Sequence, residues 1–183
     1  MGIVIIDFIN KIVDVLSVYM LPAVLIAAVP ALIAKFIFKK SYGIISFFVW
    51  IMFCILIFCE TVIRRIGLFK ETTDWIGIKE LFENPWFIVS SCENVIMFMP
   101  CGFFFCLAFR KIDERKRFWI NILFTLILSV SVEVIQFQLQ IGEAQALDVI
   151  TNIIGCIIGY GVAGVLAKKI YKLRQGNTFS YAK

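Results

Sequence analysis

The stretch FWINILFTLILSVSVEVIQFQL, from Phe118 to Leu139, decides the fold of this chain. Glu133 is its only charged residue, and the stretch matches the roughly 20 apolar residues that a helix needs to cross a bilayer. It does not alternate between polar and apolar residues as a transmembrane barrel strand does. We therefore expect a membrane-spanning helix here.

Similar apolar segments occur on both sides of this stretch, at about 15–38, 42–63, 86–109 and 147–167. Of the 183 residues, 61% are apolar and only 17% are charged, whereas soluble domains have roughly 45–50% and about 25%. This composition excludes a water-soluble enzyme and a nucleic-acid-binding domain. We predict an all-α membrane protein, a single domain over residues 1–183 built as a bundle of about five transmembrane helices.

The basic residues predict the orientation of the bundle. Thirteen of the 18 lysines and arginines fall in the turns at 35–41 and 110–117 and in the tail 168–183. Loops rich in lysine and arginine stay on the cytoplasmic side, so we expect the N-terminus outside and the C-terminus in the cytoplasm. The connection 64–85 then lies outside, either as an amphipathic element on the outer leaflet or as a solvated loop.

Several kinds of site are excluded by residue type. Histidine is absent, which removes serine–histidine triads, HExxH zinc sites and ordinary haem ligation. The six cysteines lie in apolar runs without a CxxC pair, so we interpret them as small buried hydrophobic residues. No metal and no cofactor is predicted.

Acidic residues inside the predicted spans are costly in a bilayer and therefore need an explanation. Four occur, and the predicted topology places all of them toward the outer ends of their spans: Glu60, Glu93, Glu133 and Asp148. Amide side chains accompany them, since Asn94 follows Glu93, Gln136 is three residues after Glu133, and Asn152 is four residues after Asp148. We predict a polar cavity open to the outer face, with Glu93 and Glu133 as the candidate catalytic groups should the protein be an enzyme.

Arg64 and Arg65 lie near the mouth of this predicted cavity. The planar guanidinium suits a carboxylate or a phosphate, so both arginines are candidate contacts to an anionic group of a ligand. Alternatively, they neutralise Glu60 or Glu93. For Gln136 and Asn152 the alternative to ligand binding is a hydrogen-bonded network that fixes the helix register.

Small residues indicate where helices approach closely. Gly155, Gly159 and Ala163 recur every four residues, a spacing that allows another helix to come near, including one from a second copy of the chain. Pro100 and Gly102 lie in the middle of the span 86–109, where the proline is expected to kink the helix. We assign structural roles to Pro100, Gly102, Gly155 and Gly159.

The order of these motifs resembles that of the VanZ-like family. Residues 94–103 resemble its N-x-x-x-F-x-P-x-G-F signature, residues 131–136 its S-x-E-x-x-Q element, and residues 148–160 its D-x-x-x-N-x-x-G-x-x-x-G-Y element. Thr61 and Arg64 are similar to the end of an earlier span in the family. The chain departs from the family pattern just before Asp148, where 143–147 has neither an arginine nor an acid next to Asp148.

The resemblance implies a multi-pass protein of a bacterial cytoplasmic membrane, in a family whose founding member is associated with teicoplanin resistance. The first hypothesis is a binding protein that engages a membrane lipid headgroup, a lipid-linked wall precursor or a lipoglycopeptide. The alternative is an intramembrane enzyme with a glutamate general base. A third hypothesis is a transporter. Against it, the inner halves of the spans show no polar residues for an alternating path.

Overall fold

The computed structural model describes residues 43–68 and 85–180, together with Ile76 and scattered residues between Asn10 and Ala27. Every element within the two long ranges is a helix. The four long helices are α2 (Ile44–Thr61), α4 (Pro85–Ala108), α5 (Glu114–Leu139) and α6 (Ala146–Ser180), and the short 3-10 turn η1 (Ile63–Arg65) follows α2. All four long helices are long and apolar enough to cross a membrane, which confirms the predicted helical membrane bundle.

The described ranges therefore contain four of the about five predicted spans. The first predicted span, 15–38, lies outside the described residues apart from isolated positions such as Ala23 and Ala27, which are helical. Most of the predicted outer connection 64–85 also lies outside them, because only residues 64–68, Ile76 and Pro85 are described.

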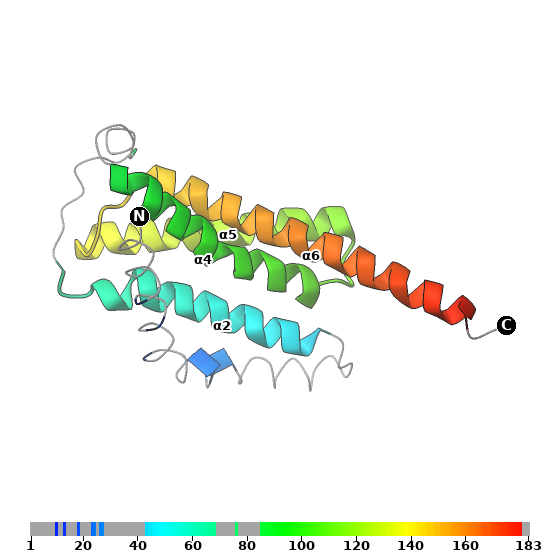
Figure 1. The fold of residues 1–183 in the computed structure, drawn as a ribbon. Helices are drawn as coiled ribbons and strands as arrows, with labels where there is room; N and C mark the ends of the chain where they lie inside the picture. Colours follow the sequence, from blue (N-terminus) through cyan, green and yellow to red (C-terminus); the bar gives the residue numbers. More distant parts are fainter. Residues whose placement is uncertain are drawn as a thin grey trace.

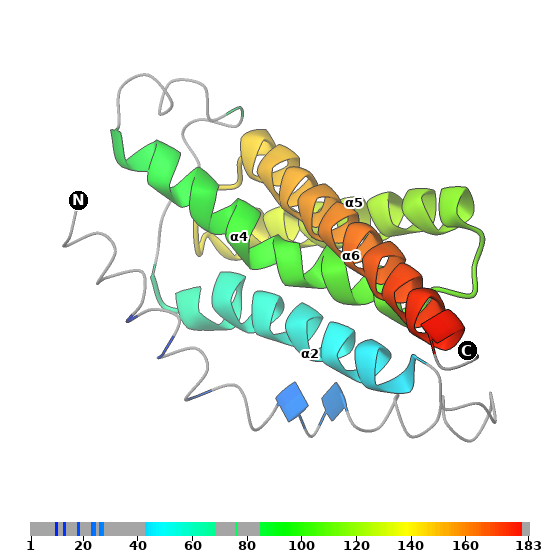
Figure 2. The ribbon, with the colours of Figure 1, turned by 45° about the vertical axis from the view of Figure 1, so that its right-hand side comes forward.

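Successive helices run in opposite directions, as consecutive membrane spans do (Figure 1). The end of α2, the start of α4, the end of α5 and the start of α6 lie together at one end of the bundle, as two views show (Figures 1 and 2). We name this the outer end, following the topology predicted from the basic residues, and the opposite end the inner end.

The helices α4 and α6 form the most extensive contact, and α2 packs on α4 while α5 packs on α6. The main apolar core joins α2, α4 and α6 around large aromatic side chains: Trp50, Phe98, Phe105 and Tyr160. The ring of Trp50 meets Phe105 edge-on, with ring centroids 5.4 Å apart, and lies 4.8 Å from the ring of Phe124 on α5. Aromatic packing around Trp50 thus joins α2, α4 and α5, and Tyr160 of α6 packs against Phe118 of α5.

Local signals explain where α5 begins and ends. It starts at Glu114, one turn before the predicted residue 118, because the side chain of Asp113 accepts a hydrogen bond from the N–H of Lys116 at 3.2 Å and caps the helix. It ends at Leu139 and is followed by Gln140, which has a φ of 52°. The N–H of Ile141 then bonds to the carbonyl of Gln136 at 3.1 Å. This closed C-terminus turns the chain back toward α6.

Candidate functional site

Polar side chains from three parts of the chain meet at the outer end. They come from the end of α2 and η1, from the last turns of α5, and from the 141–145 turn with the start of α6. We name the following residues the outer polar cluster: Thr61, Arg65, Ser129, Glu133, Gln136, Gln145 and Asn152.

Gln136 ties α5 to the end of α2. Its Nε2 donates a hydrogen bond of 3.0 Å to the carbonyl oxygen of Thr61, and its side chain is only 2% exposed. Its Oε1 is buried without a hydrogen-bond partner. Val62, Val132 and Ile141 form an apolar cluster in the same region, so the amide is held among nonpolar groups.

Glu133 is held by the turn before α6. Its Oε2 accepts a hydrogen bond of 2.9 Å from the backbone N–H of Gln145, whose own side chain is buried. The Nε2 of Gln145 lies 3.4 Å from Oε2 of Glu143. Sequence reasoning did not single out Gln145, because nothing in the pattern shows that the turn folds back on α5.

Asn152 connects α6 to α5. Its Nδ2 donates a hydrogen bond of 2.8 Å to Oγ of Ser129, and both side chains are buried. Its Oδ1, like the Oε1 of Gln136, is buried without a partner. Asp148 lies one turn earlier, in the first turn of α6.

The two arginines behave differently. Arg64 donates from Nη1 to Oε1 of Glu60 at 2.6 Å, an ion pair between residues four apart, as in one of the two alternatives considered from sequence. The guanidinium of Arg65 makes no ion pair or hydrogen bond with the described part of the chain, whereas its backbone N–H donates to the carbonyl of Val62 at 3.1 Å. A Cβ placed on Gly142 would lie 2.8 Å from Nη1 of Arg65 and 3.5 Å from Oε1 of Gln136, so the guanidinium and the orphan amide oxygen border the same spot.

Glu93 and Asn94 lie on α4 near the outer end and are half-buried. The side chain of Asn94 makes no hydrogen bond with the described residues, and none of the hydrogen bonds that hold the outer polar cluster uses it. The structure therefore brings Glu133, Gln136, Asn152 and Arg65 together more closely than it brings in Asn94.

The predicted small-residue stripe lies against α4 of the same chain. A Cβ on Gly155 would collide with the carbonyl oxygen of Val95, and one on Gly159 with that of Met99. On α4, a Cβ on Gly102 would collide with the carbonyl of Cys156, and Pro100 lies within the uninterrupted helix. Because α4 occupies the stripe, a second copy cannot dock there without displacing α4.

The expectation that the inner halves of the spans lack polar residues was wrong. Asn121 and Thr125 are fully buried in the inner half of α5, and both contact Cys156 on α6. Thr125 Oγ1 and Asn121 Nδ2 lie 2.9 and 3.2 Å from the Cys156 sulfur. The spacing of Asn121, Thr125, Ser129 and Glu133 at every fourth residue was the signal that marked one continuous polar face on α5.

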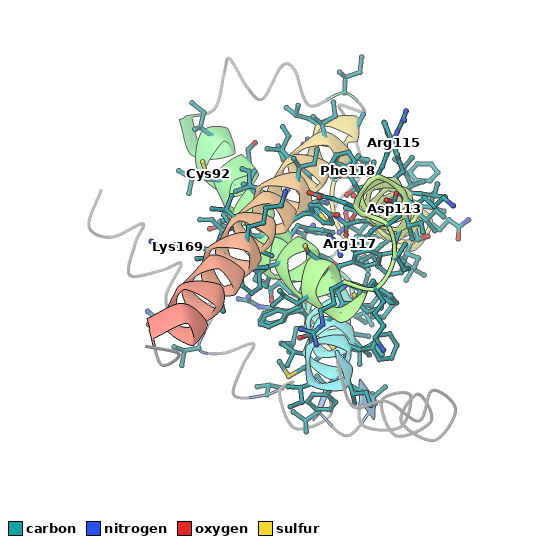
Figure 3. The ribbon with its side chains drawn as sticks, turned by 90° about the vertical axis from the view of Figure 1, so that its right-hand side faces the viewer. Cys92, Asp113, Arg115, Arg117, Phe118 and Lys169 are labelled. Atoms are coloured by element: carbon teal, nitrogen blue, oxygen red, sulfur yellow. The ribbon has the colours of Figure 1, made fainter. Side chains whose placement is uncertain are left out.

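At the inner end, basic residues separate into bound and exposed groups. Arg117 Nε donates to the hydroxyl of Tyr160 at 2.9 Å, and that hydroxyl donates to the Glu114 carbonyl at 3.2 Å. Lys168 pairs with Glu114 at 3.1 Å. Figure 3 views the molecule from this end and shows Arg115 directed away from the bundle while Arg117 lies toward the other helices.

The fold and the outer polar cluster define a multi-pass helical membrane protein with a buried polar region between its spans. The family model described as VanZ/LLP1 matches residues 44–167, so this chain belongs to the VanZ/LLP1 family. It is therefore a multi-pass bacterial membrane protein.

One curated relative carries the name Protein VanZ, from Enterococcus faecium. It is 37% identical over 76 residues, which cover 42% of this chain and 45% of the relative. The match therefore spans under half of that protein's length. No solved structure matches the chain.

Proposed function

We propose that this protein binds an envelope ligand through an anionic group at the outer end and thereby contributes to teicoplanin-type glycopeptide resistance. The ligand is a lipid headgroup, a lipid-linked wall precursor or a lipoglycopeptide, held in a polar cavity that opens outward beside Arg65, Gln136 and Gly142. Membership of the VanZ/LLP1 family supports the cellular role.

The observation that carries the proposal is the state of Arg65. Arg64, its neighbour at the end of the same span, pairs with the carboxylate of Glu60. Arg65 instead leaves its guanidinium unpaired within the described part of the chain, next to a buried amide. Its fork of N–H donors is suited to a phosphate or a carboxylate brought by a ligand.

The surrounding contacts favour a preformed site. Glu133 is fixed by the backbone of Gln145, and Gln136 is fixed by the carbonyl of Thr61. Arg65 and Asp148 both act electrostatically on Glu133, attracting and repelling its carboxylate respectively. Rigid polar groups lose little conformational freedom when a ligand binds, which supports binding rather than a purely structural role.

Replacement of Arg65 tests this proposal. In a susceptible host that expresses the chain, R65Q is expected to abolish the increase in teicoplanin resistance, and R65K is expected to retain part of it because the charge persists without the fork. The matched control is R115Q, which removes an exposed arginine at the inner end. Membrane levels of each variant are compared by immunoblot.

The decisive comparison is between the teicoplanin resistance of cells with R65Q and of cells with R115Q, when the two variants are present at equal membrane levels. Full resistance with R65Q would contradict the proposal, and so would equal loss of resistance with R115Q.

A further inference from the structure

We infer that the ligand of this site is a phosphodiester headgroup that carries its own hydrogen-bond donor, a hydroxyl or an ammonium, within a few bonds of the phosphate. This inference rests on the proposed function and specifies the ligand chemistry at the same site. It follows from hydrogen-bond acceptors that the protein itself leaves without donors.

The first step concerns the two buried amide oxygens. Oε1 of Gln136 and Oδ1 of Asn152 have no partner among the described residues, although the two residues are only 2% and 4% exposed. In each residue the amide nitrogen is already engaged, with the Thr61 carbonyl and with Ser129 Oγ respectively. These bonds fix the amide orientation, so the orphan atom is the carbonyl oxygen, and buried carbonyl oxygens normally have a donor.

The second step is the position of Arg65. A Cβ on Gly142 would lie 2.8 Å from Arg65 Nη1 and 3.5 Å from Gln136 Oε1, so the guanidinium and the amide oxygen lie near each other. The guanidinium offers only donors and positive charge, while the amide oxygen offers only an acceptor. A bare anion would satisfy Arg65 but leave the amide oxygen unpaired.

The third step is the charge around the acceptor. Glu133 is one turn before Gln136 on the same helix face, and its carboxylate is held within this cluster. A group that approaches Gln136 must therefore tolerate a neighbouring carboxylate, as a hydroxyl or an ammonium does. A phosphodiester linked to glycerol or to ethanolamine has this combination, whereas one linked to a methyl group has the anion alone.

Pairs of lipids that differ only in the donor test the inference. The purified protein is placed in phosphatidylcholine nanodiscs doped with phosphatidylglycerol or with phosphatidylmethanol, which carry the same charge, and bound lipid is measured by native mass spectrometry. We expect phosphatidylglycerol to bind about fivefold more tightly, the effect of one net hydrogen bond. A second pair compares phosphatidylethanolamine with phosphatidylcholine and reports whether an ammonium serves as the donor.

Two variants of Gln136 isolate the acceptor oxygen. Q136M and Q136E both lose the hydrogen bond from Nε2 to Thr61, but only Q136E keeps an acceptor at this position. We expect Q136M to bind the two anionic lipids equally and Q136E to keep the preference for phosphatidylglycerol, at lower affinity for both. R65Q is expected to lose both anionic lipids, whereas R115Q binds them as the unaltered chain does.

Each outcome separates this inference from the proposed function. A preference for the donor-bearing member of either pair, lost in Q136M, supports the inference and identifies the donor. Equal binding of both members in both pairs, still dependent on Arg65, overturns the inference and leaves the proposed function standing. If the protein binds none of these lipids, both this inference and the proposed function are contradicted for phospholipid headgroups.

Discussion

Thr125 and Ser131 make the same local hydrogen bond in different surroundings. Each hydroxyl donates to the carbonyl four residues earlier on α5, at 2.9 Å for Thr125 and 2.7 Å for Ser131. Thr125 is fully buried and also contacts the Cys156 sulfur on α6, whereas Ser131 is exposed on the bundle surface. Burial and the second partner, rather than the local bond, decide how much each hydroxyl contributes to stability.

Replacing the two hydroxyls should therefore have unequal effects. Thr125→Val keeps the shape of the side chain but removes the contact to Cys156, and we expect a loss of about 1 kcal/mol in the free energy of unfolding. Ser131→Ala should stay within about 0.5 kcal/mol of the unaltered chain. Unfolding by sodium dodecyl sulfate in mixed micelles measures both, and equal losses would contradict the argument.

At this scale the sequence predicted the polar residues of the outer end but not their partners. Glu133, Gln136 and Asn152 stand out because amides and acids are rare within apolar runs. The hydrogen bond of Glu133 depends on the 141–145 turn, which follows the left-handed Gln140 and cannot be derived from hydropathy. The hydrogen bonds of Gln136 and Asn152 depend on how α5 packs against α2 and α6. The inner polar residues Asn121 and Thr125 were missed because uncharged polar side chains barely lower the hydropathy of a span, although their four-residue spacing with Ser129 and Glu133 marks one face.

At the scale of elements, the contact between α4 and α6 depends on backbone approaching backbone. Gly155 and Gly159 lie directly against carbonyl oxygens of α4, while Gly161 and Gly164 on the same helix have nothing within 4 Å of a Cβ position. Glycines on one helix therefore fall into two groups, one required by packing and one not. This distinction gives opposite expectations for the same substitution.

Gly155→Ala should destabilise the protein by about 1–3 kcal/mol, because the methyl group must push α6 away from α4. The matched control Gly161→Ala should instead be neutral or stabilise by up to about 1 kcal/mol, since alanine favours the helix and meets no atom. Thermal unfolding in detergent distinguishes them. If both substitutions changed the stability in the same direction, packing against α4 would not be what requires glycine at position 155.

Hydropathy located the described elements well but placed some boundaries poorly. The α2 and α4 helices begin and end within two residues of the predicted spans 42–63 and 86–109. The start of α5 and the end of α6 lie beyond the limits predicted for their spans. Charged residues can extend a helix outside the bilayer when a cap or an ion pair stabilises it. Asp113 caps α5, and Glu114 pairs with Lys168 of α6.

For the whole molecule, the distribution of lysine and arginine sets an expectation for both sides of the membrane. The 110–117 turn carries five basic residues and lies at the opposite end of the bundle from Arg65 and the outer polar cluster. If the positive-inside rule orients the chain, the candidate site faces the cell envelope, where its proposed ligands are found.

Single cysteines introduced at the two ends test this orientation. Leu68→Cys, at a position that is 64% exposed, should react with a membrane-impermeant maleimide in intact cells. Lys116→Cys, which is exposed in the first turn of α5, should react only after the cells are permeabilised. The chain with its native cysteines alone gives the background, and the reverse labelling pattern would invert the topology and move the site to the cytoplasm.

The length of α6 has a mechanical consequence. Its apolar portion ends at Ile170, yet the helix continues to Ser180 and projects past its neighbours (Figure 1). At 1.5 Å per residue this extension is about 15 Å long. A continuous helix moves as a rigid unit. If a ligand bound at the first turns of α6 tilted the helix, its C-terminal end would be displaced as well, and a molecule in contact with that end would be affected.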